Sequence, residues 1–381
     1  MRVLFIVQGE GRGHLTQALS FAQLLQTAGH EVTGALVSVT DQREVPSFFQ
    51  DAFSAPITPI FSPGLFYNPA TNALQPTKTT LYAIRHLGGL WRSLRQVYDI
   101  IEQQRPDVVM NFFEMLGGLT YGLLRPSVPM VCVAHQYMAF HPNFQRPVGQ
   151  WLYRQAFRLS VHMTCFGAEE ILALSFDQQP DAPNQRVRIV PPLLRQEVTR
   201  LTPEAGDALL AYVTQPGLRC EVEKAHRQHP DIPIDGFHAQ ATGPDQVVDE
   251  TLTYHAINGK RFLEFMSRSR AVVTTAGFES VCEAAYLGKP VLMIPQPNHY
   301  EQACNAIDGQ RAGVGVAADK FDLDQLLDYL PKYDTSLCER FRAWHGRGYF
   351  LFLAALNRAI TPRPRPTGGF FMTRMRQLLR S

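Results

Sequence analysis

The residues whose types and spacing could do chemistry are concentrated between positions 271 and 305. A short run rich in β-branched residues, 272–275, breaks at Ala276 and Gly277 and is followed by residues with helical spacing. A glycine at this break lets a ligand approach the backbone, and a helix N-terminus offers unpaired N–H groups to phosphate. Glu283 lies about a turn and a half into the helix. Its carboxylate can accept hydrogen bonds from the two hydroxyls of a ribose, so the stretch predicts a nucleotide site.

The flanking residues predict the elements that position this site. Gly288 stops the helix, and residues 290–295 form a second apolar run that is short enough for a buried strand. A strand, a helix and a second strand in this order favour a right-handed crossover between parallel strands. The helix start and the loop at 296–302 then lie together at the carboxyl edge of the sheet, where open α/β folds bind ligands. The unit is also consistent with one βαβ repeat of another nucleotide-binding sheet.

The spacing in this stretch resembles that of a known enzyme family. It is similar to the donor-binding half of GT-B glycosyltransferases in the pattern Gly277-x5-Glu283-x4-Gly288-x-Pro290, then Pro295 and Glu301-Gln302-x2-Asn305. Two relatives are the plant and animal UDP-sugar transferases and the bacterial enzyme that adds N-acetylglucosamine to a lipid-linked peptidoglycan precursor. The resemblance implies that Glu283 holds the nucleotide ribose and that Glu301 and Gln302 contact donor sugar hydroxyls. We also expect the strand-to-helix turn to line the donor site, through Thr275, Gly277 and Phe278.

The start of the chain predicts a second glycine-rich βαβ unit. Residues 2–8 favour a buried strand, 9–14 a tight loop, 15–27 a helix and 31–38 the next strand. A dinucleotide fingerprint would need G-x-G-x-x-G and an acid near the end of the second strand. The loop instead has G-x-G-x-G spacing and the second strand ends at Ser38. This weakens a dehydrogenase interpretation without removing it, because Asp41 is close.

The same loop resembles the Gly-Gly-His opening of GT-B enzymes, and the residues GHEV that follow resemble the start of their second strand. In inverting members, the histidine at this place is the general base or lies beside the acceptor hydroxyl. The resemblance therefore implies that His14 is the catalytic base, with Gly11 and Gly13 beside it; otherwise His14 caps or packs the helix start. Imidazole suits this role because its pKa lies near neutrality. Arg12 lies where it could meet a diphosphate, although a solvent-facing arginine is an equal alternative.

Two more polar residues follow strands of the first unit. Residues 106–110 and 128–134 favour strands, and Glu114 and His135 come just after them, at the same edge as His14. Glu114 could orient His14 as a carboxylate partner, bind the acceptor, or lie at the surface. His135 is a rival candidate for the base, since it lies at the end of a strand as His14 does.

The order of elements predicts an α/β fold of two Rossmann-like domains facing across a cleft, with a C-terminal helix that crosses back to the first domain as in GT-B relatives. At 381 residues the chain is too long for one typical core. We expect an acceptor-binding domain at 1–191, whose last strands include 161–166 and 187–191, and a linker at 192–207 that begins at a Pro-Pro hinge. A nucleotide-sugar domain at 208–335, one crossing helix at 336–360 and a basic tail at 361–381 complete the chain.

Composition excludes several classes of protein. The net charge of +2 argues against a nucleic-acid partner, since nucleic-acid binders usually carry a strong basic face. The six cysteines are far apart and form no CxxC or metal-like cluster, so we expect reduced thiols and no metal. The first apolar run is too short for a signal peptide, and no run approaches a membrane span. We therefore expect a cytoplasmic protein, at most peripheral on the inner face of the membrane.

Membrane contact is an option at two basic and apolar segments. Residues 79–104 predict helices with arginines among apolar residues, after an irregular stretch at 53–76. This helical segment could contact an acceptor or a membrane, or be an amphipathic helix with a solvated basic side. The tail at 361–381 has five arginines and no acid. It is either a disordered terminus or a segment that lies on an anionic membrane.

These observations favour one function and leave others open. We expect an inverting transfer of a sugar from a nucleotide diphosphate donor, UDP-linked, to a hydroxyl of a lipid, glycan or small-molecule acceptor, without cofactor or metal. One alternative enzyme is a non-hydrolysing UDP-N-acetylglucosamine 2-epimerase, for which Glu114 and Glu301 are a sparse set of carboxylates. A non-catalytic nucleotide-sugar sensor and a dinucleotide oxidoreductase belong to other classes.

Overall fold

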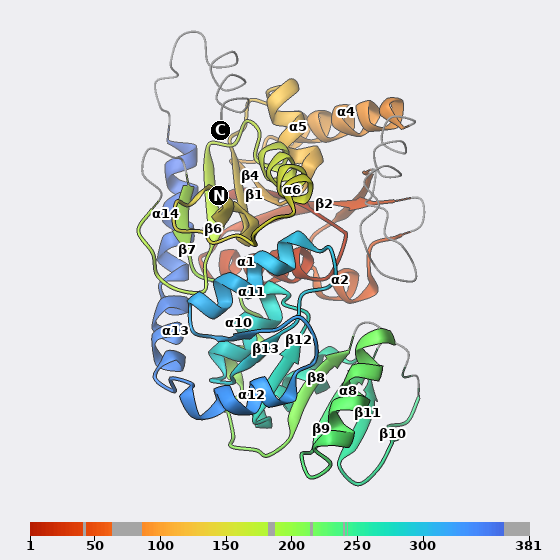
Figure 1. The fold of residues 1–381 in the computed structure, drawn as a ribbon. Coiled ribbons are helices and arrows are strands. Elements are labelled where there is room, and N and C mark those ends of the chain that lie inside the picture. Colours follow the sequence, from red (N-terminus) through yellow and green to blue (C-terminus); the bar gives the residue numbers. More distant parts are fainter. Residues whose placement is uncertain are drawn as a thin grey trace.

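The structure is a computed structural model that describes residues 1–40, 43–62, 86–181, 187–213, 216–238, 241 and 243–361. It consists of two stacked lobes, each built on a seven-stranded sheet with helices on its faces (Figure 1). We call the lobe that contains β1–β7 the first lobe and the lobe that contains β8–β14 the second lobe. The two sheets confirm the predicted α/β fold of two Rossmann-like units, while the domain limits by residue remain a prediction.

The first lobe is a parallel, doubly wound sheet of strand order β3-β2-β1-β4-β5-β6-β7. Its central strands are mainly apolar and buried, because helices cover both faces of the sheet. The strands are β1 Arg2–Val7, β2 Glu31–Val39, β3 Ile57–Phe61, β4 Val108–Phe112, β5 Met130–Ala134, β6 Glu170–Leu174 and β7 Val187–Val190. The helices are α1 Gly13–Thr27, α2 Ser47–Ala52, α4 Leu87–Gln104, α5 Met115–Leu123, η1 His135–Phe140 and α6 Trp151–Thr164.

The second lobe repeats this plan in the order β10-β11-β9-β8-β12-β13-β14, in which only the edge strand β10 is antiparallel. The strands are β8 Leu209–Val213, β9 Ile234–His238, β10 Gln246–Val247, β11 Leu252–Ala256, β12 Ala271–Thr274, β13 Val291–Met293 and β14 Gly315–Ala317. The helices are α7 Gln196–Arg200, α8 Pro216–Gln228, α9 Gly259–Arg268, α10 Phe278–Tyr286, α11 Tyr300–Arg311, α12 Leu323–Tyr329 and η2 Leu330–Lys332.

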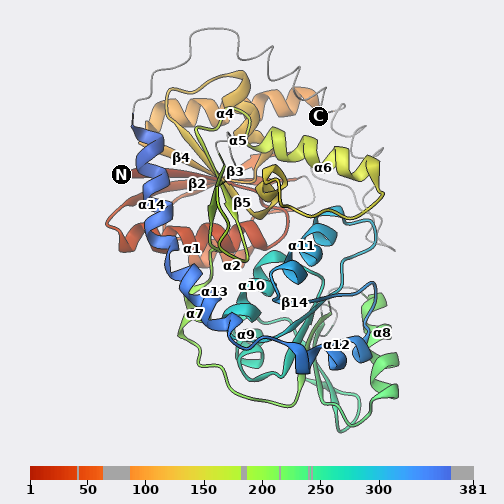
Figure 2. The same ribbon diagram turned by 60° about the vertical axis from the view of Figure 1, so that its left-hand side comes forward.

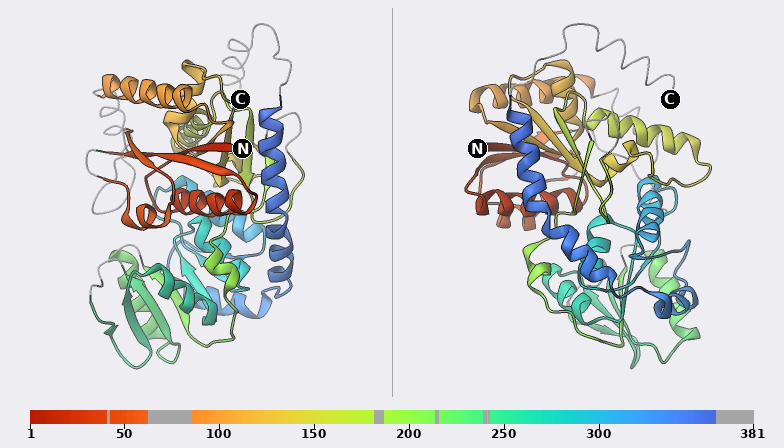
Figure 3. Two further views of the ribbon diagram at one scale, coloured as in Figure 1. Left: turned by 180° about the vertical axis from the view of Figure 1, so that it is seen from behind. Right: turned by 90° about the vertical axis from the view of Figure 1, so that its left-hand side faces the viewer.

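Two helices near the end of the described chain connect the lobes. Helix α13, Leu337–Gly346, packs against α10 of the second lobe, and α14, Gly348–Ile360, packs against the sheet of the first lobe. The pair runs along one side of the molecule in Figures 2 and 3. The predicted crossing is therefore confirmed, but as two helices rather than one, because the α13 helix ends at Gly346 and a new helix begins after Arg347.

One predicted strand is wrong. Residues 161–164 belong to α6, where Val161 and Thr164 are buried on one helix face, so their apolar character marks a helix stripe and not a strand. The strand that follows is β6. It was not predicted from the sequence because it begins with Glu170, a charged residue of a type that is usually exposed but is buried here. Arg188 and Arg358 compensate that carboxylate at 3.6 and 3.4 Å.

The loop predicted at 296–302 is shorter than expected, since α11 begins at Tyr300. The six cysteines all lie among the described residues, and no disulfide joins any two of them. In the described part of the chain, no helix combines the length and the apolar character that a membrane crossing requires. The expectations for residues 63–85 and for the tail after Thr361 lie outside the described residues.

The packing of α14 on the first lobe generates a stability prediction. Phe352 is almost fully buried, and its ring lies 5.4 Å from that of Phe21 in α1 in an edge-to-face arrangement. We expect Phe352→Ala to lower the free energy of unfolding by about 3–5 kcal/mol, because it leaves a cavity between the lobe and the crossing helix. Phe350, on the same helix but 74% exposed, supplies the control. Phe350→Ala should change stability by less than ~0.5 kcal/mol in a denaturant titration; equal losses in both variants would contradict this packing.

Candidate active site

The glycine-rich loop after β1 lies where the two lobes meet. Gly11 has φ +82°, a conformation that favours glycine. Gly13 begins α1, and a Cβ atom there would lie 2.5 Å from Oε2 of Glu279 in the second lobe. The absence of a side chain at Gly13 therefore allows a carboxylate of α10 to approach the first lobe. Arg12 is exposed, with its guanidinium 4.2 Å above the ring centre of Phe48.

His14 is in the first turn of α1 and is buried. Its Nδ1 lies 3.3 Å from Oε1 of Gln17, and its Nε2 lies 3.4 Å from the amide nitrogen of Gln136. The ring stacks on Phe113, the residue after β4, at 5.4 Å between centroids. Burial lowers the pKa of His14, while Glu301 and the hydrogen bond with Gln17 act in the opposite direction. The imidazole is therefore mainly neutral near pH 7.

Two carboxylates of the second lobe complete this cluster. The Gln17 amide donates to Oε1 of Glu279, in the first turn of α10. The Gln136 amide donates to Oε1 of Glu301, in the first turn of α11, at 2.9 Å. Desolvation raises the pKa of Glu279 to about 7. We call the five residues His14, Gln17, Gln136, Glu279 and Glu301 the seam.

Glu283 lies one helical turn after Glu279 on α10, so the carboxylate that is predicted to bind ribose is adjacent to the seam. Its side chain is 3% exposed and forms a two-point ion pair with Arg195. Nε of Arg195 lies 2.6 Å from Oε1, and Nη2 lies 2.7 Å from Oε2. Arg195 comes from the segment that joins the two lobes, just before α7. No local sequence signal indicates this pairing, because the two residues are 88 positions apart.

The strand-to-helix turn before α10 contains Thr275, Ala276 and Gly277. Ala276, not Gly277, has the left-handed backbone, with φ +59°, and its carbonyl accepts a hydrogen bond from the buried Asn305 at 3.0 Å. Gly277 is the N-cap of α10 and has an ordinary extended backbone. Thr275 is half-buried in the same turn. Gln302 also has a local partner, since its side-chain oxygen accepts from the Gln296 N–H at 2.8 Å.

Glu114 does not occupy the place beside His14 that the sequence suggested. It is the N-cap of α5, and its carboxylate accepts from the Leu116 N–H at 3.0 Å and the Ser62 hydroxyl at 3.1 Å. Burial raises its pKa. The side chain at Nδ1 of His14 is Gln17 instead. Sequence reasoning missed Gln17 although it is one turn from His14 on the predicted helix, a spacing that brings side chains together.

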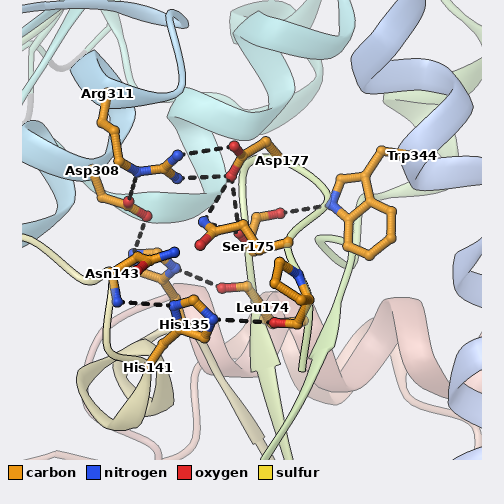
Figure 4. Close-up of polar contacts among 11 residues, drawn as sticks. His135, His141, Asn143, Leu174, Ser175, Asp177, Asp308, Arg311 and Trp344 are labelled. Atoms are coloured by element: carbon orange, nitrogen blue, oxygen red, sulfur yellow. Dashed lines mark hydrogen bonds and ion pairs between the residues drawn. The ribbon is translucent and has the colours of Figure 1, made fainter. Parts of the chain in front are cut away.

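His135 lies at a second contact between the lobes, shown in Figure 4. Its Nδ1 donates to the Leu174 carbonyl at 2.7 Å, and its Nε2 faces Oδ2 of the fully buried Asp308 at 3.8 Å. The ring stacks on Phe278 of α10, with 4.0 Å between centroids. Burial lowers its pKa, against the effect of Asp308. His135 and Phe278, both predicted to bind substrate, therefore pack against each other.

Arg311 of α11 connects the lobes at this second contact (Figure 4). Its Nη1 and Nη2 donate to Asp177 of the first lobe at 2.9 and 2.7 Å, and its Nε donates to Asp308 at 2.7 Å. Trp344 of α13 adds a hydrogen bond from its indole N–H to the Ser175 carbonyl at 3.0 Å. Near both contacts, the described residues include no group of three His, Cys, Asp or Glu side chains placed to hold a metal ion.

Two facing Rossmann-like lobes, a C-terminal helix that crosses back, and polar side chains gathered where the lobes meet define the GT-B class of glycosyltransferases. The chain belongs to glycosyl transferase family 1, whose family model matches residues 1–333. It is thus a glycosyltransferase, and the resemblance inferred from Gly277, Glu283 and the first glycine-rich loop is confirmed at the level of the family.

Curated relatives and solved structures agree with this assignment. An uncharacterized glycosyltransferase of Methanosarcina acetivorans is 23% identical over 338 residues, 83% of each chain. An enzyme of Bartonella henselae, named UDP-N-acetylglucosamine--N-acetylmuramyl-(pentapeptide) pyrophosphoryl-undecaprenol N-acetylglucosamine transferase, is 40% identical over 63 residues, 16% of this chain and 17% of that one. The glycotransferase of kitacinnamycin has a TM-score of 0.60 at 17% identity, covering 94% of this chain and 97% of that one. Acinetobacter baumannii MurG has a TM-score of 0.56 at 15% identity, and the match covers 94% of this chain and 99% of that one.

The ion pairs of Arg311 generate the second prediction. Arg311→Met removes the cation that compensates the buried Asp308, so we expect a loss of about 3–5 kcal/mol in unfolding free energy. Arg340→Met is the matched control, because Arg340 pairs with Asp334 where both side chains are 58% exposed. That substitution should cost about 0–1 kcal/mol. Denaturant titrations of the full chain measure both, and a loss for Arg311→Met no larger than that for the control would contradict the role of Arg311.

Proposed function

We propose that the protein is an inverting glycosyltransferase that moves a sugar from a UDP-linked donor to an acceptor hydroxyl. The observation that carries the proposal is the seam. An imidazole of the first lobe and two carboxylates of the second lobe belong to one hydrogen-bonded cluster. The predicted ribose carboxylate, Glu283, is one helical turn from that cluster.

In this proposal, the acceptor hydroxyl lies against Nε2 of His14. His14 takes its proton as the hydroxyl oxygen attacks the anomeric carbon of the donor sugar. The bond between that carbon and the diphosphate oxygen breaks on the opposite face, and therefore the configuration inverts. The lowered pKa of His14 supports the role, because a neutral imidazole is needed to accept a proton. Glu301 and Gln302, at the start of α11, are assigned to the hydroxyls of the donor sugar.

The donor site is assigned to the turn before α10 and to Glu283. Thr275, Gly277 and the N-terminus of α10 would bind the diphosphate, because unpaired N–H groups there favour anions. Each oxygen of Glu283 accepts one hydrogen bond from Arg195 and retains a second lone pair. The carboxylate can therefore accept from ribose hydroxyls while its ion pair remains. A uridine donor is supported by the Bartonella henselae relative, which is named for UDP-N-acetylglucosamine. A fold neighbour, SpnG, was solved with thymidine diphosphate; its TM-score is 0.54 at 16% identity.

Substrate entry requires movement of the lobes in this proposal. His14, Gln17, Gln136 and Glu283 are all buried, so a nucleotide sugar reaches them only when the seam separates. Hinged closure around a substrate is a common way to exclude water from a transfer reaction. The acceptor class stays a lipid, glycan or small molecule. A cytoplasmic location at the inner face of the membrane is part of the proposal, supported by the undecaprenol-linked substrate in the name of that relative.

The base assignment predicts the behaviour of His14→Ala. We expect UDP release from UDP-sugars in the presence of an acceptor extract to fall by about 10²- to 10⁴-fold, because the proton of the acceptor then has no base. The affinity for UDP, measured by calorimetry, should stay nearly unchanged. His229→Ala is the control, since His229 pairs with Asp324 outside the seam. Turnover that survives the His14 substitution would remove His14 as the base.

The ribose assignment predicts a change in nucleotide preference. The wild-type chain should bind UDP more tightly than 2′-deoxy-UDP, by about 10-fold or more, since a hydrogen bond to a charged acceptor contributes roughly 1.5–3 kcal/mol. Glu283→Gln should reduce this preference by weakening UDP more than the deoxynucleotide. Glu339→Gln, an exposed first-turn acid of α13, should retain it. An undiminished preference in Glu283→Gln, measured by calorimetry, would argue against ribose binding by Glu283.

A further inference from the structure

The hydrogen bonds around His14 specify which ring nitrogen carries its proton. A glutamine side chain has a donor end and an acceptor end, and a carboxylate in its ionised form only accepts. The Gln17 amide must therefore turn its NH₂ group towards Glu279 and its carbonyl towards Nδ1 of His14. An acceptor at 3.3 Å from Nδ1 favours a proton on that nitrogen. Nε2 is then left with its lone pair.

The opposite side of the ring leads to the same assignment through independent residues. Gln136 donates one amide hydrogen to Glu301 at 2.9 Å, and its nitrogen lies 3.4 Å from Nε2 of His14. If the Gln136 amide were reversed, its carbonyl would face the Glu301 carboxylate, and two acceptors would be in contact. The donor end of Gln136 therefore faces Nε2, which must accept. This contact is long, so an incoming acceptor hydroxyl can replace it.

We infer that Glu279 is a positioning residue for the reaction: through Gln17 it fixes the tautomer of His14 with the proton on Nδ1 and a free lone pair on Nε2. This inference rests on the proposed function, in which Nε2 is the base. Glu279 belongs to the second lobe and His14 to the first. The lone pair on Nε2 of His14 is therefore specified only when the lobes are closed. A separated lobe pair leaves the Gln17 amide free to rotate and the tautomer unspecified.

The protonation state of Glu279 makes the tautomer of His14 depend on pH. A protonated Glu279 can donate, so the Gln17 amide can reverse and present NH₂ to Nδ1, which favours the proton on Nε2 and removes the base. The pKa of about 7 for Glu279 centres this loss near neutral pH, above the lowered pKa of His14. The charged groups that act on Glu279 are Glu301 of α11 and Glu283 of its own helix, and it interacts with Arg195 of the connecting segment. Glu301 also acts on His14.

The test exchanges the side chains at positions 17 and 279 in the full-length chain. In Glu279→Gln, both partners can donate or accept, so the Gln17 amide loses its fixed orientation. In the double variant Q17E/E279Q, the new carboxylate at 17 accepts directly from Nδ1, and the new amide at 279 donates to it. We expect kcat to fall about 2- to 10-fold in Glu279→Gln, because only the Nδ1-protonated fraction of a tautomer mixture retains the base. The KM for the donor should change little, and the double variant should recover most of this loss. The acid limb of the pH profile that Glu279 causes near pH 7 should be absent in Glu279→Gln.

A direct reading of the tautomer keeps this inference separate from the proposed function. Histidine labelled with ¹⁵N distinguishes protonated from unprotonated ring nitrogens, and the His14→Ala variant identifies the His14 signals. At pH 8 the wild type and the double variant should both have the proton on Nδ1, while Glu279→Gln and Gln17→Met should give a mixture. Glu339→Gln, which removes an exposed first-turn acid, should match the wild type in every measurement.

The inference is overturned by a wild-type proton on Nε2 at pH 8, or by a double variant that is no better than Glu279→Gln. Sugar transfer that requires His14 but is indifferent to Glu279 also overturns it, and leaves the proposed function intact. The reverse combination is equally informative. No transfer by the wild type, together with the expected tautomers, contradicts the proposed function while the role of Glu279 in fixing the tautomer stands.

Discussion

The placement of the lobes depends on the guanidinium of Arg311, which lies between carboxylates of different lobes. Asp308 is fully buried on the same helix, and Asp177 comes from the loop after β6. A buried charge without partners is costly, so this set is stable only in a narrow range of geometries. A shift of a few ångströms between the lobes would separate Arg311 from Asp177, and His135 from Asp308, while Arg311 and Asp308 of the same helix would stay paired. Arg311 and Glu301 are on the same helix. The placement of the lobes that pairs Arg311 with Asp177 therefore also brings Glu301 within hydrogen-bond distance of Gln136.

Polar and apolar contacts between the lobes are placed differently. Near the glycine-rich loop the contacts are hydrogen bonds between amides and carboxylates, which water can replace at modest cost when the lobes separate. Elsewhere, one apolar cluster includes residues of both lobes, among them Phe21 of α1, Phe278 of α10 and Phe352 of α14. Burial of this surface favours continued contact. We therefore expect separation at the polar edge while the apolar cluster persists.

Much of the fold could be predicted from the sequence because its signals are local. Apolar runs such as residues 2–7 and 271–274 ended at glycine-containing turns, and the helix at 278–286 followed with regular spacing. The failures also have local causes. The stretch at 161–164 is a helix stripe with β-branched residues, and β6 begins with a buried glutamate that reads as solvent-exposed.

The contacts that complete the site could not be predicted in this way. Gln17 and Glu279 are 262 positions apart, and Arg195 and Glu283 are 88 apart, so nothing in the local pattern of either member points to its partner. The resemblance named Glu283 and His14 as candidates but not the side chains that contact them. Glu114 shows the opposite error. A carboxylate at the correct edge of the sheet was more simply the cap of the next helix.

Within the part of the chain that the structure describes, the backbone passes between the lobes twice, once after β7 and once between α13 and α14. The two passages touch, since a Cβ atom on Gly348 would lie 3.2 Å from the Pro191 ring. Two adjacent covalent connections resist twisting and sliding far more than a single tether does, and leave rotation about one axis as the easiest relative motion. Opening of the molecule should therefore follow a reproducible arc, with each closure returning the same pairs of side chains to register.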